Sequence, residues 1–143
     1  MIIRTWEEKD LDRIEEMERA CFSDPWKRTD LEGVIKFPFY QSFLAEEGGQ
    51  VCGYGCMIAL FETAEIANIA VDIPFRKRGI GREILQAMHA KAKALGASEA
   101  LLEVRKSNVA AIALYESMGY SRYGIRENYY GDEDAILMRK ELQ

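Results

Sequence analysis

Segments with two different spacings of hydrophobic residues alternate along the chain, and each spacing predicts one type of secondary structure. Apolar residues three or four positions apart predict helices, whereas short runs rich in β-branched and aromatic residues predict strands. The clearest helical stripe begins after Gly79 and ends at Gly96, with apolar positions at Ile80, Ile84, Leu85, Met88, Ala92 and Leu95. Between Tyr40 and Leu60 the pattern instead predicts two strands joined by a turn at Gly48 and Gly49.

Applied to the whole chain, the patterns predict the order strand, two helices, three strands, helix, strand, helix and two strands. The predicted strands are Ile2 to Trp6, Tyr40 to Glu46, Val51 to Leu60, Ala64 to Val71, Ala100 to Val104, Tyr120 to Tyr129 and Asp134 to Glu141. The predicted helices are Asp10 to Cys21, Asp30 to Lys36, Ile80 to Leu95 and Val109 to Met118. Thr29 and Glu32 have capping-box spacing for the second helix, and Asn108 is a suitable N-cap for the last.

Length and charge narrow the class of protein. The chain has 143 residues, of which 48% are apolar, enough for one domain with one core. Lys and Arg total 19 and Asp and Glu total 24, so the net charge of −5 argues against a protein that coats nucleic acid. The longest apolar stretch, around Val51 to Phe61, is too short for a membrane span, and the N-terminus does not resemble a signal peptide. We therefore expect a cytoplasmic protein without nucleic-acid or membrane partners.

The cysteines predict packing rather than disulfide or metal chemistry. Cys21, Cys52 and Cys56 are an odd number in a chain without an export signal, so we expect them to be reduced. The even spacing of Cys52 and Cys56 predicts that both lie on one face of a sheet. A zinc site with the lone His89 is the alternative, but it requires a long-range coincidence, so no metal is expected.

The segment Asn68 to Gly81 carries the clearest chemical signal. A predicted strand ends in a basic loop with two glycines, Arg76-Lys77-Arg78-Gly79-Ile80-Gly81, and a helix follows directly. Free N–H groups at a helix N-terminus bind anions, and glycines let a phosphate approach the backbone. Because the chain lacks both a dinucleotide glycine fingerprint and a Walker loop, the loop favours a different pyrophosphate carrier. A solvated basic turn is the alternative interpretation.

These residues, with three further segments, resemble the GNAT acetyltransferases over the whole chain. The further segments are Leu102 to Asn108, Ala113 to Tyr120 and Arg126 to Tyr130, followed by Glu133-Asp134-Ala135. Together they look like the RimI-type branch, the alanine N-acetyltransferases of a small-subunit ribosomal protein. Phe22-Ser23-Asp24-Pro25-Trp26 is similar to that branch's Phe-Pro-Trp segment but carries two extra residues. The expected fold is a single α/β (α+β) domain over residues 1–143, a mixed, mostly antiparallel seven-stranded sheet flanked by about four helices.

The resemblance implies acetyl-CoA as the cosubstrate and assigns residues to it. The backbone of Ile69, Ala70 and Val71 would contact the pantetheine arm, and Asn108 would make a further contact. The pyrophosphate would be held by Arg76, Lys77, Arg78, Gly79, Ile80, Gly81 and Arg82. Glu103 matches the general base of the family and Tyr115 the general acid. Without the resemblance, Glu103 could equally be a paired structural carboxylate and Tyr115 a core aromatic.

The assigned roles also make chemical sense. An α-amine has a pKa of about 7.7 to 8.0, so it must lose a proton before it attacks a thioester, and a carboxylate can take that proton. A phenol can protonate the departing thiolate. The predicted acceptor is therefore a protein N-terminus, possibly alanine of a ribosomal protein. A lysine side chain or a small amine is the alternative acceptor, and a CoA-sensing module without turnover is a third hypothesis.

The acceptor site is predicted at the turn of the last hairpin. Tyr129 and Tyr130 would line the slot for a peptide N-terminus, although they could simply cover the sheet edge. The acidic residues around them, Glu127, Asp132, Glu133 and Asp134, could attract a cationic amine or be solvated. Three aromatic residues near the second helix present the same choice, and we expect core packing for at least two of them: Phe37, Phe39 and Tyr40.

Overall fold

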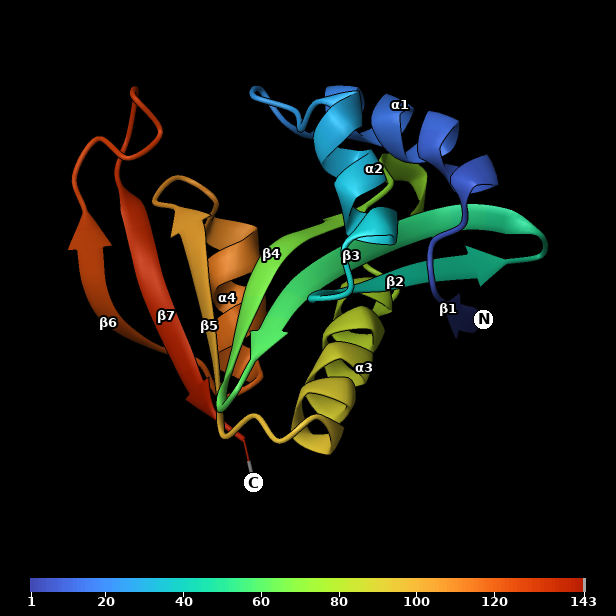
Figure 1. Cartoon of the computed structure of the whole chain (residues 1–143). Helices are drawn as coiled ribbons and strands as arrows, with labels where there is room; N and C mark the ends of the chain where they lie inside the picture. Colours follow the sequence, from blue (N-terminus) through green and yellow to red (C-terminus); the bar gives the residue numbers. More distant parts are fainter. Residues whose placement is uncertain (143) are drawn as a thin grey trace.

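A seven-stranded sheet forms the centre of the molecule, seen in a computed structural model that describes residues 1–142 (Figure 1). Its strands are β1 (Ile2–Arg4), β2 (Tyr40–Glu47), β3 (Gln50–Leu60), β4 (Thr63–Val71), β5 (Glu99–Arg105), β6 (Ser121–Arg126) and β7 (Ala135–Glu141). Their order across the sheet is β1-β2-β3-β4-β5-β7-β6. Only β4 and β5 pair in parallel, which confirms the predicted mixed and mostly antiparallel sheet.

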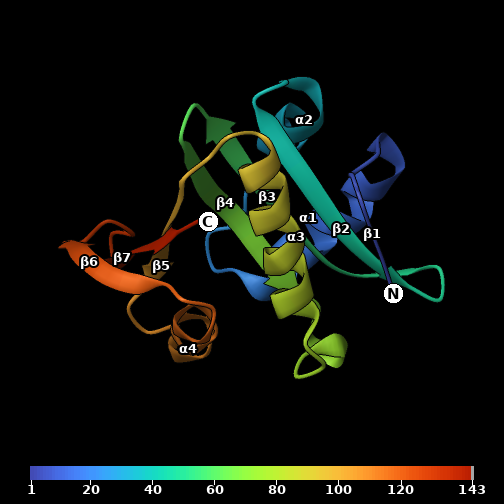
Figure 2. The same ribbon diagram turned by 90° about the horizontal axis from the view of Figure 1, so that it is seen from below.

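Helices cover both faces of the sheet and bury two apolar clusters (Figure 2). One face carries α1 (Leu11–Cys21) and α2 (Arg28–Lys36), whose apolar stripes pack on Leu44 and Tyr54. The other carries α3 (Ile80–Ala94) and α4 (Val109–Ser117). Two short 3-10 helices, η1 (Glu8–Asp10) and η2 (Ile73–Phe75), precede α1 and α3. Apart from these, the predicted order of elements is the observed order.

The parallel pair β4–β5 is short and leaves an opening in the sheet. Pairing covers only Thr63–Glu65 against Glu99–Leu101, and beyond it the strands diverge (Figure 1). A bulge contributes, because β3 pairs Cys56 with Asn68 but Met57 with Ile66, which leaves Ala67 as an extra residue. Such a residue bends and twists its strand. We refer to the space between the diverging parts of β4 and β5 as the β4–β5 opening.

Strand ends differ from the prediction where tertiary contacts compete with the pattern. The first strand stops at Arg4, because Trp6 turns into the core and its indole N–H donates to the carbonyl of Phe43 (2.9 Å). The predicted strand from Tyr120 to Tyr129 is shorter, from Ser121 to Arg126. Tyr120 is buried beside α4, and Asn128 has a left-handed backbone that begins a turn.

Two predictions around α2 were wrong. The helix begins at Arg28 rather than after a Thr29 cap, and the carboxylate of Asp30 accepts the N–H of Lys27 (3.4 Å). Phe37 and Phe39 are exposed and stack on each other with ring centroids 5.5 Å apart, so they do not pack in the core. Only Tyr40 is partly buried there. Stacking removes part of each ring from water without requiring a place in the core.

Cys52 and Cys56 lie on opposite faces of the sheet, which corrects the predicted shared face. Cys52 belongs to the cluster under α3, whereas Cys56 belongs to the cluster under α1 and α2. A register shift at Ala45/Glu46 changes the alternation of β3, since one irregular residue reverses which side chains point to a face. All three cysteines are free thiols. Across residues 1–142, no three His, Cys, Asp or Glu side chains gather closely enough to hold a metal ion.

The helices described here include none that is both long enough and apolar enough to cross a membrane.

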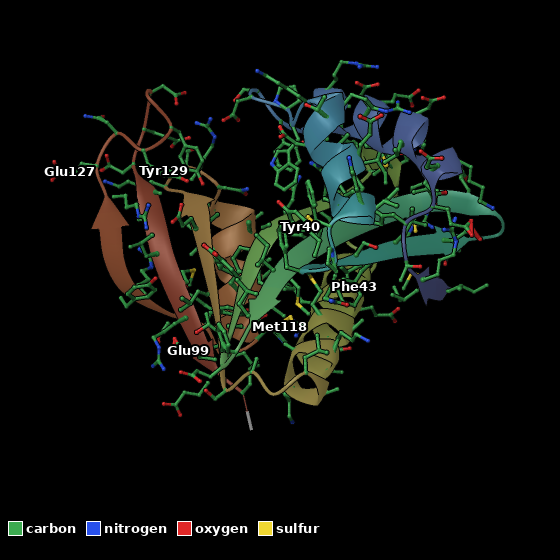
Figure 3. The ribbon with its side chains drawn as sticks, in the orientation of Figure 1. Tyr40, Phe43, Glu99, Met118, Glu127 and Tyr129 are labelled. Atoms are coloured by element: carbon green, nitrogen blue, oxygen red, sulfur yellow. The ribbon has the colours of Figure 1, made fainter. Side chains whose placement is uncertain are left out.

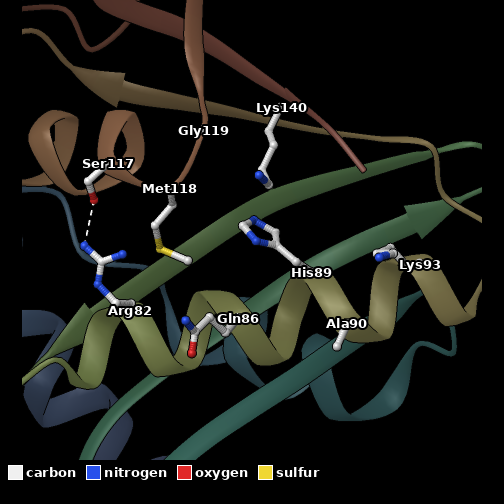
Figure 4. A pocket seen from close by; sticks show the side chains of 9 residues that line it. All are labelled: Arg82, Gln86, His89, Ala90, Lys93, Ser117, Met118, Gly119 and Lys140. Carbon is white, nitrogen blue, oxygen red and sulfur yellow. Dashed lines mark hydrogen bonds between the residues drawn. The ribbon is translucent and has the colours of Figure 1, made fainter. Parts of the chain in front are cut away.

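His89 is a buried titratable group whose protonation opposes folding. Its Nε2 lies 2.7 Å from the hydroxyl of Tyr120, and burial, together with nearby Lys140, lowers the pKa of the imidazole from 6.5 to about 4 (Figure 4). Between these two values the unfolded chain binds a proton that the folded chain does not, so stability falls as the pH is lowered through this window. We expect the melting temperature to drop between pH 6.5 and 4 in the native protein, and to drop less in His89→Gln, as measured by circular dichroism. A constant difference between the two proteins across this range would contradict the assignment.

Candidate functional site

The upper part of β4 offers a free backbone edge to the β4–β5 opening. Ile69, Ala70 and Val71 pair with β3 on one side. Their other edge lies beyond the last β4–β5 pair, and no strand of residues 1–142 pairs with it. Unpaired N–H and C=O groups on an edge can bind an extended ligand as an added strand, and on this edge the carbonyl of Val71 is engaged by a nearby arginine, Arg76. The position is the one expected for a pantetheine arm.

The N-terminus of α3 lies at the end of this edge and has the geometry of an anion site. Val71 is followed by η2 and the basic loop, and Gly79 caps α3 with a left-handed backbone (φ 79°). Gly79 has no side chain to accept hydrogen bonds, so the first N–H groups of the helix lack a side-chain cap. Free N–H groups and the positive end of the helix dipole together attract an anion.

Three arginines surround this helix end, and each is oriented by a different neighbour. Arg76 donates from Nε to the carbonyl of Val71 (3.0 Å). Arg78 lies 3.6 Å from the carboxylate of Glu47, and its guanidinium lies over the ring of Phe75. Arg82 donates to the hydroxyl of Ser117 in α4 (2.8 Å; Figure 4). All three side chains are exposed, so the anion site stays a prediction beside the alternative of a solvated basic turn.

Helices α3 and α4 pack closely where the start of α3 meets the second half of α4. A Cβ at Gly81 would lie only 3.3 Å from Leu114 of α4, so glycine allows this close approach. Asn108 caps α4, as predicted, by accepting the N–H of Ala111 at its side-chain oxygen (3.2 Å). Asn108 is exposed.

Glu103 lies on β5, on the wall of the opening opposite β4. Alternate residues of β5 point into the core under α3 and α4, so Glu103 faces the other side of the sheet. Its side chain is 22% exposed and lies 3.4 Å from the guanidinium of Arg126. The carboxylate is therefore reachable from solvent and is paired with only one partly exposed cation, unlike a carboxylate fixed in a buried network.

Tyr129 and Tyr130 lie in the segment between β6 and β7 (residues 127–134), in which Figure 3 labels Tyr129. Their rings contact each other edge to face at 5.1 Å. The charge of Glu103 raises the pKa of Tyr129, and burial followed by the charge of Glu103 raises the pKa of Tyr130 to about 12. Both tyrosines thus share the space in front of the carboxylate.

Tyr115 lies on α4, in the core cluster under α3 and α4. Its ring is buried and meets Tyr120 edge to face at 5.7 Å. Burial raises the pKa of the Tyr115 phenol, and Tyr130 raises it further, which shows that these two side chains interact electrostatically. Among residues 1–142 no buried side-chain oxygen or nitrogen lacks a hydrogen-bond partner. The structure places the Tyr115 ring in the core cluster, and its role as a proton donor stays a prediction.

The sequence assigned no role to one charged side chain near Glu103, Arg105. It lies two residues after Glu103, on the same face of β5, and pairs with Asp24, Asp132 and Glu133. Buried and exposed residues alternate along β5, so the sequence did predict which face of the sheet Arg105 lies on. Nothing in the sequence indicated that Asp24 would pair with it. Most of the predicted acidic run is therefore engaged within the protein, since Asp134 also accepts the N–H of Asn128 (3.0 Å).

Comparisons with known proteins match most or all of the chain. The model of the acetyltransferase (GNAT) family matches residues 11–120. A [ribosomal protein bS18]-alanine N-acetyltransferase from Escherichia coli is 34% identical over 140 residues, covering 95% of this chain and 94% of that protein. A putative enzyme of the same description from Bacillus subtilis is 31% identical, covering 95% and 92%. A crystal structure of an Escherichia coli ribosomal-protein alanine N-acetyltransferase superposes with a TM-score of 0.91 at 32% identity, covering 99% and 94% of the two chains.

Proposed function

The chain belongs to the acetyltransferase (GNAT) family, and we propose that it transfers the acetyl group of acetyl-CoA to the N-terminal α-amine of a protein. The observation that carries this proposal is the β4–β5 opening, with the N-terminus of α3, which lacks a side-chain cap, beside it and Glu103 on its β5 wall. The relatives named above act on an N-terminal alanine of a ribosomal protein, and we propose the same class of acceptor for this chain.

In this proposal the donor lies along β4 with its pyrophosphate at α3. The backbone of Ile69 to Val71 holds the pantetheine arm, and the first N–H groups of α3 with Arg76, Arg78 and Arg82 hold the pyrophosphate. Lys77 and Gly79 both have a left-handed backbone, which shapes the loop around the phosphates. Asn108 holds the donor from the start of α4. These contacts direct the thioester into the β4–β5 opening.

Glu103 and Tyr115 then move the protons. Glu103 takes a proton from the α-ammonium group, directly or through a water, and leaves a neutral amine. The amine nitrogen attacks the thioester carbonyl, an amide bond forms and the carbon–sulfur bond breaks. Tyr115 donates its phenolic proton to the departing thiolate, giving CoA as a thiol. The attacking nitrogen loses its second proton to water as the amide forms. Glu103 then releases its proton to solvent and Tyr115 regains one, so each turnover converts an ammonium group and a thioester into an amide, a thiol and one released proton.

Mass spectrometry of acetyl transfer tests the proposal. One peptide begins with a free alanine and contains an internal lysine, and a matched peptide has its N-terminus blocked. We expect one acetyl group on the first peptide, located at the α-amine, and none on the second.

Two other outcomes contradict the proposed acceptor. Acetylation of lysine in both peptides indicates side-chain specificity. If neither peptide is acetylated while calorimetry still shows binding of acetyl-CoA, the result indicates a small-amine acceptor or a module that only senses CoA.

A further inference from the structure

Arg105 ties together two chain segments that lie on either side of the β4–β5 opening. One is the segment between α1 and α2 (residues 22–27), which contributes Asp24, 3.1 Å from the guanidinium. The other is the β6–β7 segment, which contributes Asp132 at 2.9 Å and Glu133 at 3.0 Å. Figure 1 shows these two segments at the same end of the molecule, above the point where β4 and β5 have separated.

The guanidinium is held from several directions at once. Its carbon lies 4.3 Å from the centre of the Tyr130 ring, and its side chain is only 21% exposed. Glu133 also accepts hydrogen bonds from the backbone N–H (3.1 Å) and hydroxyl (2.9 Å) of Ser107, which connects this cluster to the start of α4. A planar group with five donors suits such an arrangement better than a lysine does.

The Asp24 contact differs from the other two because it crosses the opening. Asp132 and Glu133 belong to the same half of the sheet as Arg105, so their contacts support the hairpin. Asp24 belongs to the opposite half, and within residues 1–142 its ion pair is the only one that joins residues 22–27 to β5, β6, β7 or their connections. The same segment is anchored below by buried Glu18, which accepts the N–H of Trp26 (2.9 Å).

We propose that Arg105 is a positioning residue that holds residues 22–27 and the β6–β7 segment as the two walls of the acceptor slot. This inference rests on the proposed transfer to an amine, because Glu103 defines the slot and lies on the same face of β5. A slot whose walls are tied before binding loses less conformational freedom when the acceptor enters. Arg105 therefore lowers KM for the acceptor through Asp24, without touching the donor.

Paired isosteric variants separate this role from ordinary stabilisation. Asp24→Asn removes the contact across the opening, and Asp132→Asn removes the same charge from the same guanidinium within one half of the sheet. Both side chains are well exposed, at 62% and 71%, so neither substitution should prevent folding. We expect Asp24→Asn to raise KM for the acceptor about tenfold, with KM for acetyl-CoA unchanged, and Asp132→Asn to raise it less than threefold.

Arg105→Gln distinguishes a tie from direct binding of the acceptor by Asp24. If Asp24 binds the ammonium group itself, freeing it from Arg105 strengthens acceptor binding and lowers KM. If Arg105 acts as a tie, the same substitution raises KM for the acceptor at least as much as Asp24→Asn. A lowered KM, or equal effects of Asp24→Asn and Asp132→Asn, overturns the proposal.

These kinetics are measured with whichever amine the native protein acetylates in the two-peptide assay. If the native protein acetylates lysine instead, the proposed function fails, while the tie is still tested with that acceptor. If the native protein acetylates the α-amine and all three variants have the same KM for the acceptor as the native protein, the positioning role of Arg105 is overturned and the proposed function stands.

Discussion

Glu103→Gln is expected to lower kcat by about 100- to 1000-fold, with KM for acetyl-CoA changed less than twofold. Glutamine keeps the size of the side chain but cannot accept the ammonium proton. The other carboxylate on that face of β5, Glu99, lies at the opposite end of the strand, 3.8 Å from Arg139. Steady-state transfer to a peptide with a free N-terminal alanine measures the effect. The donor site lies on β4 and α3, so its binding should be preserved.

Two comparisons make this prediction specific to proton removal. Glu127→Gln removes the same charge from an exposed position in the β6–β7 segment and should leave kcat within about threefold of the native value. The deficit of Glu103→Gln should also shrink at pH 9, where an α-amine with a pKa of about 8 is already neutral. A kcat for Glu103→Gln within threefold of native at pH 7 would falsify the assignment of Glu103 as the base.

Much of the fold follows from local patterns that the sequence shows directly. The helical stripe from Ile80 to Leu95 predicts α3 almost to its ends, because one face of the helix packs on the sheet. The alternation of β5 is just as direct, since Ala100, Leu102 and Val104 are buried and the residues between them are not. The glycine before α3 marks a left-handed cap that other residues rarely adopt. Each of these features depends on a few residues that are neighbours in the sequence, so each can be predicted from the sequence.

Other features depend on contacts between distant residues, which no local pattern encodes. The extra residue Ala67 twists β4 only because of its pairing with β3, so the β4–β5 opening is a property of the sheet. The opposite faces of Cys52 and Cys56 have the same kind of cause, a register shift between strands. The pairing of Arg105 with Asp24 requires the two halves of the fold to meet. The basic loop before α3 was therefore predictable as a motif, whereas the walls of the β4–β5 opening were not.

Tyr115→Phe is expected to lower kcat about 10- to 100-fold, a smaller effect than that of Glu103→Gln. Burial keeps the phenol protonated, so Tyr115 is always ready to donate as the carbon–sulfur bond breaks. Its contribution is limited because a thiol with a pKa of about 8.5 is already a reasonable leaving group, whereas an ammonium group cannot attack at all. The variant keeps the buried ring and its contact with Tyr120, so the melting temperature should change little.

Tyr120→Phe is the matched control for this variant. It removes a hydroxyl from the neighbouring ring of the same core cluster, but that hydroxyl bonds to His89 rather than reaching the opening. We expect it to lower stability, because it leaves His89 without its partner, and to leave kcat within about threefold of native. The two tyrosines therefore predict opposite patterns, lost turnover with a stable fold at Tyr115 and retained turnover with a weakened fold at Tyr120. Equal kcat values for the two variants, measured at saturating acetyl-CoA and peptide, would show that the Tyr115 hydroxyl does not donate the proton.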